Sequence, residues 1–356
     1  MSAPPPELRC LIAAGGTAGH VLPSLAVADA LRARGAAVTF AGSPDRVEAE
    51  LVPGRGYAFD PFRISGFPRR PSPALVRALA RATAAPAACA KILRRRRPHV
   101  VLGGGGYVAG PMVAAAWALR IPAALTEADA HLGLANRLAE PFARRVFLAY
   151  AIEGREPPKY RVTGRPVPAR EPVTREQARA AFGLPAEGPV LLVAGGSQGA
   201  QALNDFAVAE WGETGPAVLH LCGERYRDEL AGRVRRPEYR LLPFVDDFGA
   251  AASAADLTIS RAGGTVWELA AVGAPALLVP SPNVTADHQT LNARHFERGG
   301  GAIVVPEPEL GRAAPLVEEL LAAPDRLAAM REAMLAMARP QAADEIAEEL
   351  IALARV

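Results

Sequence analysis

Three glycine-rich turns are the first features of the sequence that could do chemistry. Each follows a short apolar run and precedes a helical pattern, and they occupy residues 15–20, 103–106 and 195–199. A strand that ends in glycines and feeds a helix directs bare backbone N–H groups and the positive helix terminus toward one edge of a sheet. Diphosphates can be held there without a metal ion. One such turn alone is more often a tight connection, but three of them favour ligand binding.

None of the three turns carries a common nucleotide signature. Neither the dinucleotide pattern GxGxxG nor the P-loop pattern GxxxxGK[ST] fits them. The interpretations as an NAD-dependent enzyme or an ATPase therefore lose the motifs that would have been their main support.

Two side chains are well placed to move a proton. His20 lies where the first glycine turn meets a helical pattern, and Glu127 ends an apolar run. An imidazole or a carboxylate at the edge of a sheet can act as a general base. Each also has a structural alternative, since His20 could hydrogen-bond at a helix end and Glu127 could cap the following segment.

A second group of polar side chains could bind the sugar and ribose of a nucleotide-sugar. Glu268 comes one helical turn after the glycines at 263–264, where a carboxylate can accept both ribose hydroxyls. Its alternative is an ordinary acidic residue in a first helical turn. The polar cluster at 287–293 follows another apolar run and could fix sugar hydroxyls or begin a solvated helix.

The elements that must position these residues alternate between strands and helices, which predicts an α/β fold with parallel sheets and helices on both faces. The pattern restarts near residue 190, so we expect two Rossmann-like domains facing a central cleft, at 1–164 and 165–339. A C-terminal helix at about 340–356 could pack on either domain. Strands are expected at 8–14, 37–41, 100–102, 123–125, 146–149, 190–194, 217–221, 239–242, 257–259, 276–279 and 302–305.

Composition limits the class of protein. The 356 residues are 50% apolar and 22% charged, which suits two domains with ample cores. Cys10, Cys89 and Cys222 show neither a disulfide framework nor zinc spacing, so we expect a reducing compartment and no metal. The start lacks a signal-peptide pattern, and no apolar run reaches the roughly 18 residues of a membrane span. These features predict a cytoplasmic protein.

The charge is distributed unevenly along the chain. Residues 62–99 hold ten Arg/Lys and no acid, while the remaining 30 basic residues face 37 acidic ones, a balance of −7. An apolar stripe beside arginines is typical of a helix on an anionic membrane, although a crossover helix of the core is the alternative. Nucleic acid is the weaker partner because no aromatics interleave. The membrane-facing candidates are Leu75, Leu79, Arg77, Arg81, Arg94, Arg95, Arg96 and Arg97.

Six strings in this order and spacing resemble the MurG-type transferase family over nearly the whole chain. They are GGTAGH (15–20), GGGGYVAGP (103–111), TEADAHLGLANR (126–137), GGSQGAQALN (195–204), SRAGGTVWELAAVGAPALLVP (260–280) and DHQTLNA (287–293). The resemblance implies a GT-B fold and inverting transfer of N-acetylglucosamine from UDP-N-acetylglucosamine to the C4 hydroxyl of the muramoyl unit of lipid I, giving lipid II. It also implies no obligatory metal or cofactor and a peripheral location on the inner face of the cell membrane.

The resemblance also implies roles for particular residues. His20 and Glu127 would be catalytic, and Arg165 or Arg170 would contact the diphosphate. The acceptor would meet Gly104, Gly105, Tyr107, Asp129 and Asn136. The donor would meet Thr17, Ala18, Gly19, Ser197, Gln198, Val245, Ala262, Gly263, Gly264, Thr265, Glu268 and Gln289.

Three segments depart from the family pattern: the first glycine turn, the segment Thr126-Glu127-Ala128-Asp129, which reads HEQN in the family, and the linker Arg165-Pro166-Val167-Pro168, which reads Asn-Pro-Val-Arg. Ala18 replaces a glycine, which is tolerable only if its φ is negative. Asp129 replaces an asparagine and so exchanges a donor and acceptor for an anion that only accepts, which calls for a nearby arginine or a different acceptor pocket. Pro168 stands where the family has an arginine, so Arg165 or Arg170 would have to replace it.

Three other functions fit parts of the sequence. A related transferase could glycosylate a natural product or diacylglycerol, and a UDP-N-acetylglucosamine 2-epimerase would consume the same nucleotide-sugar without an acceptor. A non-catalytic binding scaffold is the third.

Overall fold

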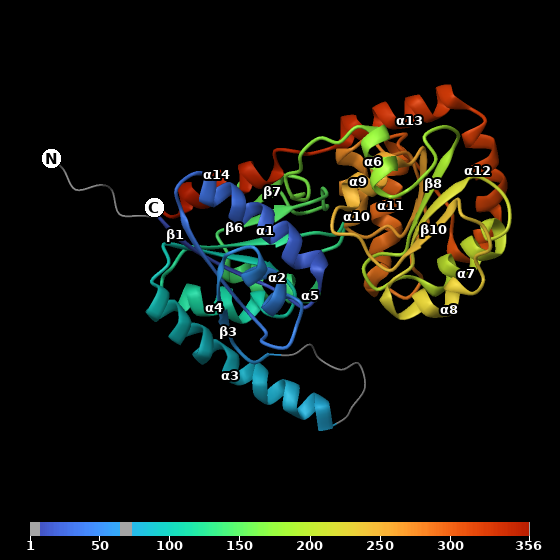
Figure 1. Ribbon diagram of the computed structural model, residues 1–356. Helices are drawn as coiled ribbons and strands as arrows, with labels where there is room; N and C mark the ends of the chain where they lie inside the picture. Colours follow the sequence, from blue (N-terminus) through green and yellow to red (C-terminus); the bar gives the residue numbers. More distant parts are fainter. Residues whose placement is uncertain (1–7, 65–72, 356) are drawn as a thin grey trace. The chain divides into compact units, whose positions relative to one another are not determined.

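The computed structural model describes residues 8–64 and 73–355, with backbone but not side chains for residues 73–83 and Thr285. The chain forms two compact units (Figure 1). One unit contains the residues up to Ala169 together with the segment from Arg339, and the other runs from Arg170 to Ala338. Each unit is described by itself.

The first unit is built on a seven-stranded sheet in which every neighbouring pair is parallel, in the order β3-β2-β1-β4-β5-β6-β7. Its strands are β1 (Arg9–Ala14), β2 (Ala37–Gly42), β3 (Ala58–Pro61), β4 (Val100–Gly105), β5 (Ala123–Glu127), β6 (Arg145–Leu148) and β7 (Tyr160–Val162). Its helices are α1 (Ala18–Ala33), α2 (Glu48–Gly54), α3 (Pro73–Arg96), α4 (Ala109–Ala118), α5 (Leu134–Ala139), the 3₁₀ turn η1 (Glu140–Phe142) and α14 (Ala342–Leu353).

Helices cover both faces of this sheet because its strands are apolar on both sides. Along β1, Leu11 packs with α3 and α4, whereas its neighbour Ile12 packs with α1 and α14. The last helix therefore belongs to the first unit, where it lies along α1 (Figure 1).

The second unit repeats the same design with a six-stranded parallel sheet, in the order β10-β9-β8-β11-β12-β13. Its strands are β8 (Val190–Ala194), β9 (Ala217–Leu221), β10 (Tyr239–Leu242), β11 (Leu257–Ser260), β12 (Ala276–Leu278) and β13 (Ala302–Val304). Its helices are α6 (Arg175–Ala181), α7 (Gln201–Trp211), α8 (Arg227–Ala231), α9 (Phe248–Ala254), α10 (Thr265–Ala271), α11 (His288–Arg298), α12 (Ala313–Leu321) and α13 (Pro324–Met337), with the 3₁₀ turns η2 (Glu224–Tyr226), η3 (Thr285–Asp287) and η4 (Glu307–Arg312).

Both strand orders are those of a doubly wound Rossmann sheet, which confirms the expected architecture within each unit. In such sheets ligands bind at the carboxyl ends of the two central strands, where the strand order reverses. That point lies between β1 and β4 in the first unit and between β8 and β11 in the second. The glycine turns that follow β1, β4 and β8 all end at these two points.

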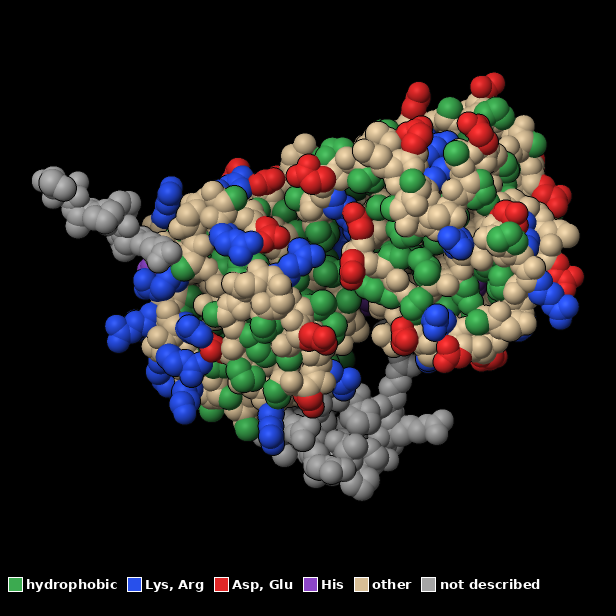
Figure 2. Space-filling view, viewed as in Figure 1, with side chains coloured by type: hydrophobic (Ala, Val, Ile, Leu, Met, Phe, Trp, Pro, Cys, Tyr) green, Lys and Arg blue, Asp and Glu red, His purple; other side chains and the backbone are tan. Residues whose placement is uncertain are grey.

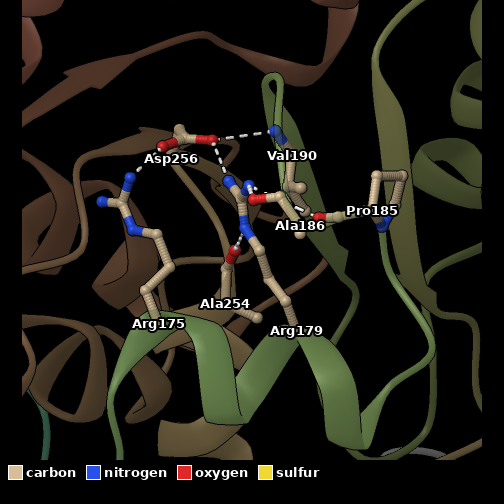
Figure 3. A network of polar contacts seen from close by, with 7 residues as sticks. All are labelled: Arg175, Arg179, Pro185, Ala186, Val190, Ala254 and Asp256. Carbon is tan, nitrogen blue, oxygen red and sulfur yellow. Dashed lines mark hydrogen bonds and ion pairs between the residues drawn. The ribbon is translucent and has the colours of Figure 1, made fainter.

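A buried ion pair closes the opposite, amino-terminal edge of the second sheet (Figure 3). Asp256, just before β11, accepts hydrogen bonds from Arg179 Nη2 and from the backbone N–H of Val190, both at 2.8 Å. Arg179 also donates to the carbonyl oxygens of Ala254 and Ala186. Its guanidinium thus joins α6 to the starts of two adjacent strands.

We expect Arg179→Met to lower the free energy of unfolding by about 3 kcal/mol, because it leaves the carboxylate of Asp256 with less compensation in a buried place. Arg175 pairs with the same carboxylate from a side chain that is 41% exposed, so the matched change Arg175→Met should cost about 1 kcal/mol or less. Urea unfolding followed by tryptophan fluorescence measures both. Equal costs would show that the buried pair is not the source of the stability.

Candidate functional sites of the two units

His20 is seated at the switch point of the first unit by glycines. It lies in the first turn of α1, and its ring lies on Gly105 at the end of β4. A Cβ at Gly105 would lie only 2.5 Å from His20 Cδ2, and the φ of Gly105 is +105°. A side chain at that position would therefore displace the imidazole. The second glycine turn thus provides the space for His20.

The surroundings of His20 favour its neutral form. Burial is the main cause that lowers the pKa of His20, and the Arg165 guanidinium lowers it further. Asp129 and a hydrogen bond with the Gly15 carbonyl raise that pKa, but they are the smaller causes. The imidazole is therefore unprotonated at neutral pH, which is the state that a general base requires.

Arg165 reaches α1 because of a proline. Pro23 has no N–H, so the carbonyl of Gly19, four residues earlier, lacks its usual helical donor. Arg165 Nη2 donates to that carbonyl at 2.6 Å, and the side chain is buried. The guanidinium is thus fixed one residue from His20, which agrees with its electrostatic effect on the imidazole.

Glu127 organises the loop that follows β5. Its Oε1 accepts from the N–H of Asp129 at 3.2 Å, and its Oε2 accepts from the N–H of Gly133 and from Asn136 Nδ2, both at 2.9 Å. Burial raises the pKa of Glu127, and the bonds from Gly133 and Asn136 oppose that rise. These contacts match the capping alternative, since both oxygens already hold the loop.

The remaining candidates of the first unit lie around the same turns. Tyr107 lies over Gly16, and its buried hydroxyl has no hydrogen-bond partner among the described residues. Gly104 leaves room for the Ser24 hydroxyl, since a Cβ there would lie 2.0 Å from Ser24 Oγ. Ala18 begins α1 and is not among the residues with positive φ, so the condition set for this replacement is confirmed.

The start of α1 leaves two backbone amides without a helical acceptor. Thr17 is the exposed N-cap residue of α1, and the N–H groups of Ala18 and Gly19 have no carbonyl one turn earlier, as at any helix start.

Asn136 donates to Thr126 and Glu127, and its buried Oδ1 has no partner within the described part of the chain.

One residue of this site was missed by the sequence reasoning. Glu48, the first residue of α2, is fully buried against the first glycine turn. Its Oε2 accepts from the N–H of Gly16, and its Oε1 accepts from the N–H of Ser43, both at 3.0 Å. The Gly16 N–H is therefore engaged within the protein. An acid in a short helix gives no sequence signal, because most such residues are exposed.

The second unit presents its own glycine turn after β8. Gly199 has a φ of +69°, and a Cβ there would lie 1.9 Å from the carbonyl oxygen of Cys222. Asn204 donates to the same carbonyl at 2.9 Å. The turn is thus packed tightly against the end of β9, which leaves Ser197 and Gln198 exposed at its tip.

Glu268 is held by an arginine at the beginning of the second unit. Arg170 Nη2 donates to Glu268 Oε2 at 2.8 Å, and Nη1 donates to Asp247, which also caps α9 through the N–H of Ala250. Two carboxylates therefore already share Arg170, the residue suggested as a diphosphate contact. The geometry fits an arginine that orients Glu268.

Two amides shape the loops beside Glu268. Gln289 accepts from the N–H of Ser281 at 2.9 Å through its oxygen, which leaves its NH₂ group on the other side of the amide. Asn292, fully buried, donates to the carbonyl of buried Ala262 at 3.1 Å. The half-buried candidates in the same part of the unit are Val245, Gly263, Gly264 and Thr265.

The basic segment is partly neutralised within the first unit. Figure 2 shows Lys and Arg side chains gathered where α3 ends. Two of them, Arg95 and Arg96, form ion pairs with buried Asp60, whereas Arg94 and Arg97 are exposed. Leu75, Arg77, Leu79 and Arg81 lie on α3 in the stretch whose side chains are outside the description.

The described residues contain no cluster of three His, Cys, Asp or Glu side chains that could hold a metal ion. None of the helices in the described ranges combines the length and hydropathy needed to cross a bilayer.

Comparisons with known proteins agree with this division of the chain. Residues 10–148 match the glycosyltransferase family 28 N-terminal domain, and residues 190–349 match the family's C-terminal domain. The UDP-N-acetylglucosamine–N-acetylmuramyl-(pentapeptide) pyrophosphoryl-undecaprenol N-acetylglucosamine transferase of Salinibacter ruber is 40% identical over 97% of this chain and 96% of its own. The transferase of the same name from Nitrosococcus oceani is 41% identical over 98% and 99%.

A solved structure extends this likeness to three dimensions. The crystal structure of Acinetobacter baumannii MurG superposes with a TM-score of 0.76 at 28% identity and covers 98% of this chain and 100% of its own. The fold, the two family domains and the full-length relatives give one answer: this chain belongs to glycosyltransferase family 28 and, within it, to the MurG-type N-acetylglucosamine transferases.

Proposed function

We infer that this enzyme transfers N-acetylglucosamine from UDP-N-acetylglucosamine to the C4 hydroxyl of the lipid-linked N-acetylmuramyl-pentapeptide, with inversion. The relatives' names state this donor and acceptor class. The observation in the structure that carries the chemistry is the half-buried imidazole of His20, seated on Gly105 at the switch point of the first unit, with its pKa lowered mainly by desolvation.

We assign the donor to the second unit. Glu268 would accept the ribose hydroxyls, and the tip at Ser197 and Gln198 would meet the diphosphate with its hydroxyl, amide and N–H groups. Gln289 would donate its NH₂ to a sugar hydroxyl, because its oxygen is already engaged by Ser281. Donors aimed at the diphosphate stabilise the charge that develops as UDP leaves.

We assign the acceptor to the first unit, with His20 as the base. The acceptor's C4 oxygen forms a bond to C1 of N-acetylglucosamine, and the bond between C1 and the phosphate oxygen breaks. The C4 proton passes to His20, and the bonding electrons leave with UDP. Arg165 and Asp129 flank the imidazole, so a positive and a negative group tune its basicity.

We further propose that catalysis needs no metal ion, because backbone N–H groups and the amide and hydroxyl side chains of the turn can replace one at the diphosphate. Transfer measured in excess EDTA should equal transfer in added magnesium. A loss of activity in EDTA that magnesium restores would contradict this point.

The decisive experiment for the function is radiolabel transfer from UDP-N-acetylglucosamine to a lipid I analogue. The label should move to the lipid product only when the acceptor is present. Release of free UDP and an interconverted sugar without acceptor would instead identify an epimerase, and transfer to diacylglycerol but not to the analogue would identify a different acceptor class.

A lipid-linked acceptor requires contact with a membrane, and the first unit exposes an apolar patch that suits it. Trp117 on α4 and Leu134 and Leu138 on α5 are 59%, 67% and 66% exposed. Three exposed arginines lie on or near the same helices: Arg120, Arg137 and Arg144. No ion pair in the described ranges involves them. Apolar side chains among unpaired cations favour an anionic lipid surface.

We expect the double change Leu134→Gln and Leu138→Gln to weaken binding to phosphatidylglycerol vesicles about tenfold or more, because two exposed leucines lose their burial in the lipid. Leu335→Gln, a change at a half-exposed leucine of the second unit, is the matched control. Vesicle co-sedimentation measures both. Unchanged binding by the double variant, or equal binding to neutral vesicles by the wild type, would contradict the patch.

A further inference from the structure

The buried carboxylate of Glu48 has no role in the mechanism above. Both of its oxygens accept hydrogen bonds from backbone N–H groups, of Gly16 and of Ser43. Acceptance on both oxygens suits an ionised carboxylate, in which both oxygens are acceptors only. No ion pair within the described residues involves Glu48. The negative charge of Glu48 therefore acts on the two peptide groups whose N–H groups donate to it.

One of those peptide groups also meets His20. The N–H of the Gly15–Gly16 peptide donates to Glu48, and the C=O of the same peptide lies beside the His20 ring, whose pKa it raises. A Cβ at Gly106 would lie 2.2 Å from Gly15 O and 3.5 Å from His20 Nδ1, so this carbonyl and this ring nitrogen lie over the same glycine. Because N–H and C=O point in opposite directions in a trans peptide, the carboxylate and the imidazole lie on opposite sides of one planar unit.

We propose that Glu48 is a positioning residue that acts through the Gly15–Gly16 peptide and holds His20 with Nδ1 protonated and Nε2 free to accept a proton. A negative charge at the N–H end polarises the peptide and makes its carbonyl a stronger acceptor for Nδ1–H. The hydrogen bond at one ring nitrogen decides the state of the other. The proposal rests on the proposed function, in which His20 is the base.

Close packing supports the same role. A Cβ at Gly15 would lie 2.1 Å from Glu48 Oε1, and a Cβ at Gly42 would lie 2.8 Å from Glu48 Cγ. The carboxylate therefore fits between the ends of β1 and β2 without room to rotate. Such a side chain fixes the plane of the peptide that His20 meets.

Other groups face His20 and do not change when Glu48 is replaced. Arg165, from the segment after β7, and Asp129, from the loop after β5, act on its charge, while Thr17 Oγ1 lies 3.4 Å from its Nδ1 and the Tyr107 ring covers Gly16. A difference between the wild type and a Glu48 variant therefore reports on the carboxylate alone.

The test is Glu48→Gln, which keeps the shape but turns an NH₂ group toward one of the two N–H donors. We expect kcat/KM for the lipid I analogue to fall about 10- to 100-fold, by analogy with the loss on removing partners that orient metal-binding histidines. The acid limb of its pH profile should move to lower pH, because His20 becomes a weaker base without the negative charge. UDP affinity, measured by calorimetry, should stay the same. Glu50→Gln, an exposed position on the same helix, should match the wild type.

An unmoved acid limb in Glu48→Gln overturns the proposal, even if the rate falls, because a merely structural role would lower the rate alone. A second measurement uses the wild-type enzyme and so does not depend on the variant's folding. Long-range ¹⁵N spectra, assigned with His20→Gln, should show His20 as the Nδ1–H tautomer, and the Nε2–H tautomer overturns the proposal. If the wild type transfers no sugar yet shows the expected tautomer, the proposed function fails and the contact with Glu48 stands.

Discussion

Replacing His20 with glutamine is expected to lower kcat by about 10²- to 10⁴-fold, the usual contribution of a positioned general base. Glutamine keeps a polar side chain in the place of the imidazole but cannot take up the proton of the C4 hydroxyl. Because burial and Arg165 lower the pKa of His20, the wild-type enzyme should stay active as the pH falls below 6.5, until the imidazole becomes protonated. Initial rates at saturating donor and acceptor, measured from pH 5 to 9, give both quantities.

Two controls separate chemistry from folding in this experiment. UDP affinity should be nearly unchanged in His20→Gln, since the proposed nucleotide contacts lie in the second unit. His99→Gln alters a histidine just before β4, at the amino-terminal edge of the same sheet, and should keep the wild-type rate. A His20→Gln enzyme with wild-type kcat would exclude His20 as the base and leave Glu127 as the remaining candidate.

Removing the Glu268 carboxylate is expected to have the second large effect, on donor binding. Each hydrogen bond to a charged group contributes about 1.5–3 kcal/mol, so the loss of contacts to two ribose hydroxyls in Glu268→Ala should raise the Kd for UDP about 100-fold or more. The kcat at saturating donor should change much less, because the ribose does not react. Isothermal calorimetry with UDP measures the affinity directly.

The surface change Glu332→Ala provides the control for this measurement, since Glu332 is an exposed acid of the same unit. The loss of Glu268 also leaves Arg170 with Asp247 as its carboxylate partner among the described residues, so thermal unfolding must be compared as well. An intact fold that binds UDP as tightly as the wild type would show that Glu268 only orients Arg170.

The apolar runs were sufficient to predict the fold. Strands such as 190–194 and 217–221 are continuous apolar segments next to glycine turns, and the structure confirms them. Strands β3 and β7 were not predicted, because AFDP is short and contains proline, while YRV is partly exposed and polar at its centre. Both are edge strands, where burial leaves the weakest pattern.

The candidate site was predictable only where function depends on backbone conformation. Glycines at 105 and 199 are required by positive φ and close contacts, and such requirements leave a trace in the sequence. Glu48 leaves none, because its role depends on two N–H groups 5 and 32 residues away. Arg170 was assigned by its nearness to the linker, whereas its contacts with Asp247 and Glu268 depend on segments about 80 and 100 residues later.

The return of α14 to the first unit has a consequence for biosynthesis. Ile346, Leu350 and Leu353 complete the core that begins with β1 and α1, although more than 300 residues separate them in translation. The first half of the polypeptide therefore leaves the ribosome with an uncovered apolar groove along α1, while residues 170–338 contain every strand of their own sheet. Premature termination before residue 342 would yield a chain in which residues 170–338 can fold. Its first unit would keep the apolar groove along α1 uncovered and remain a target for chaperones and proteases.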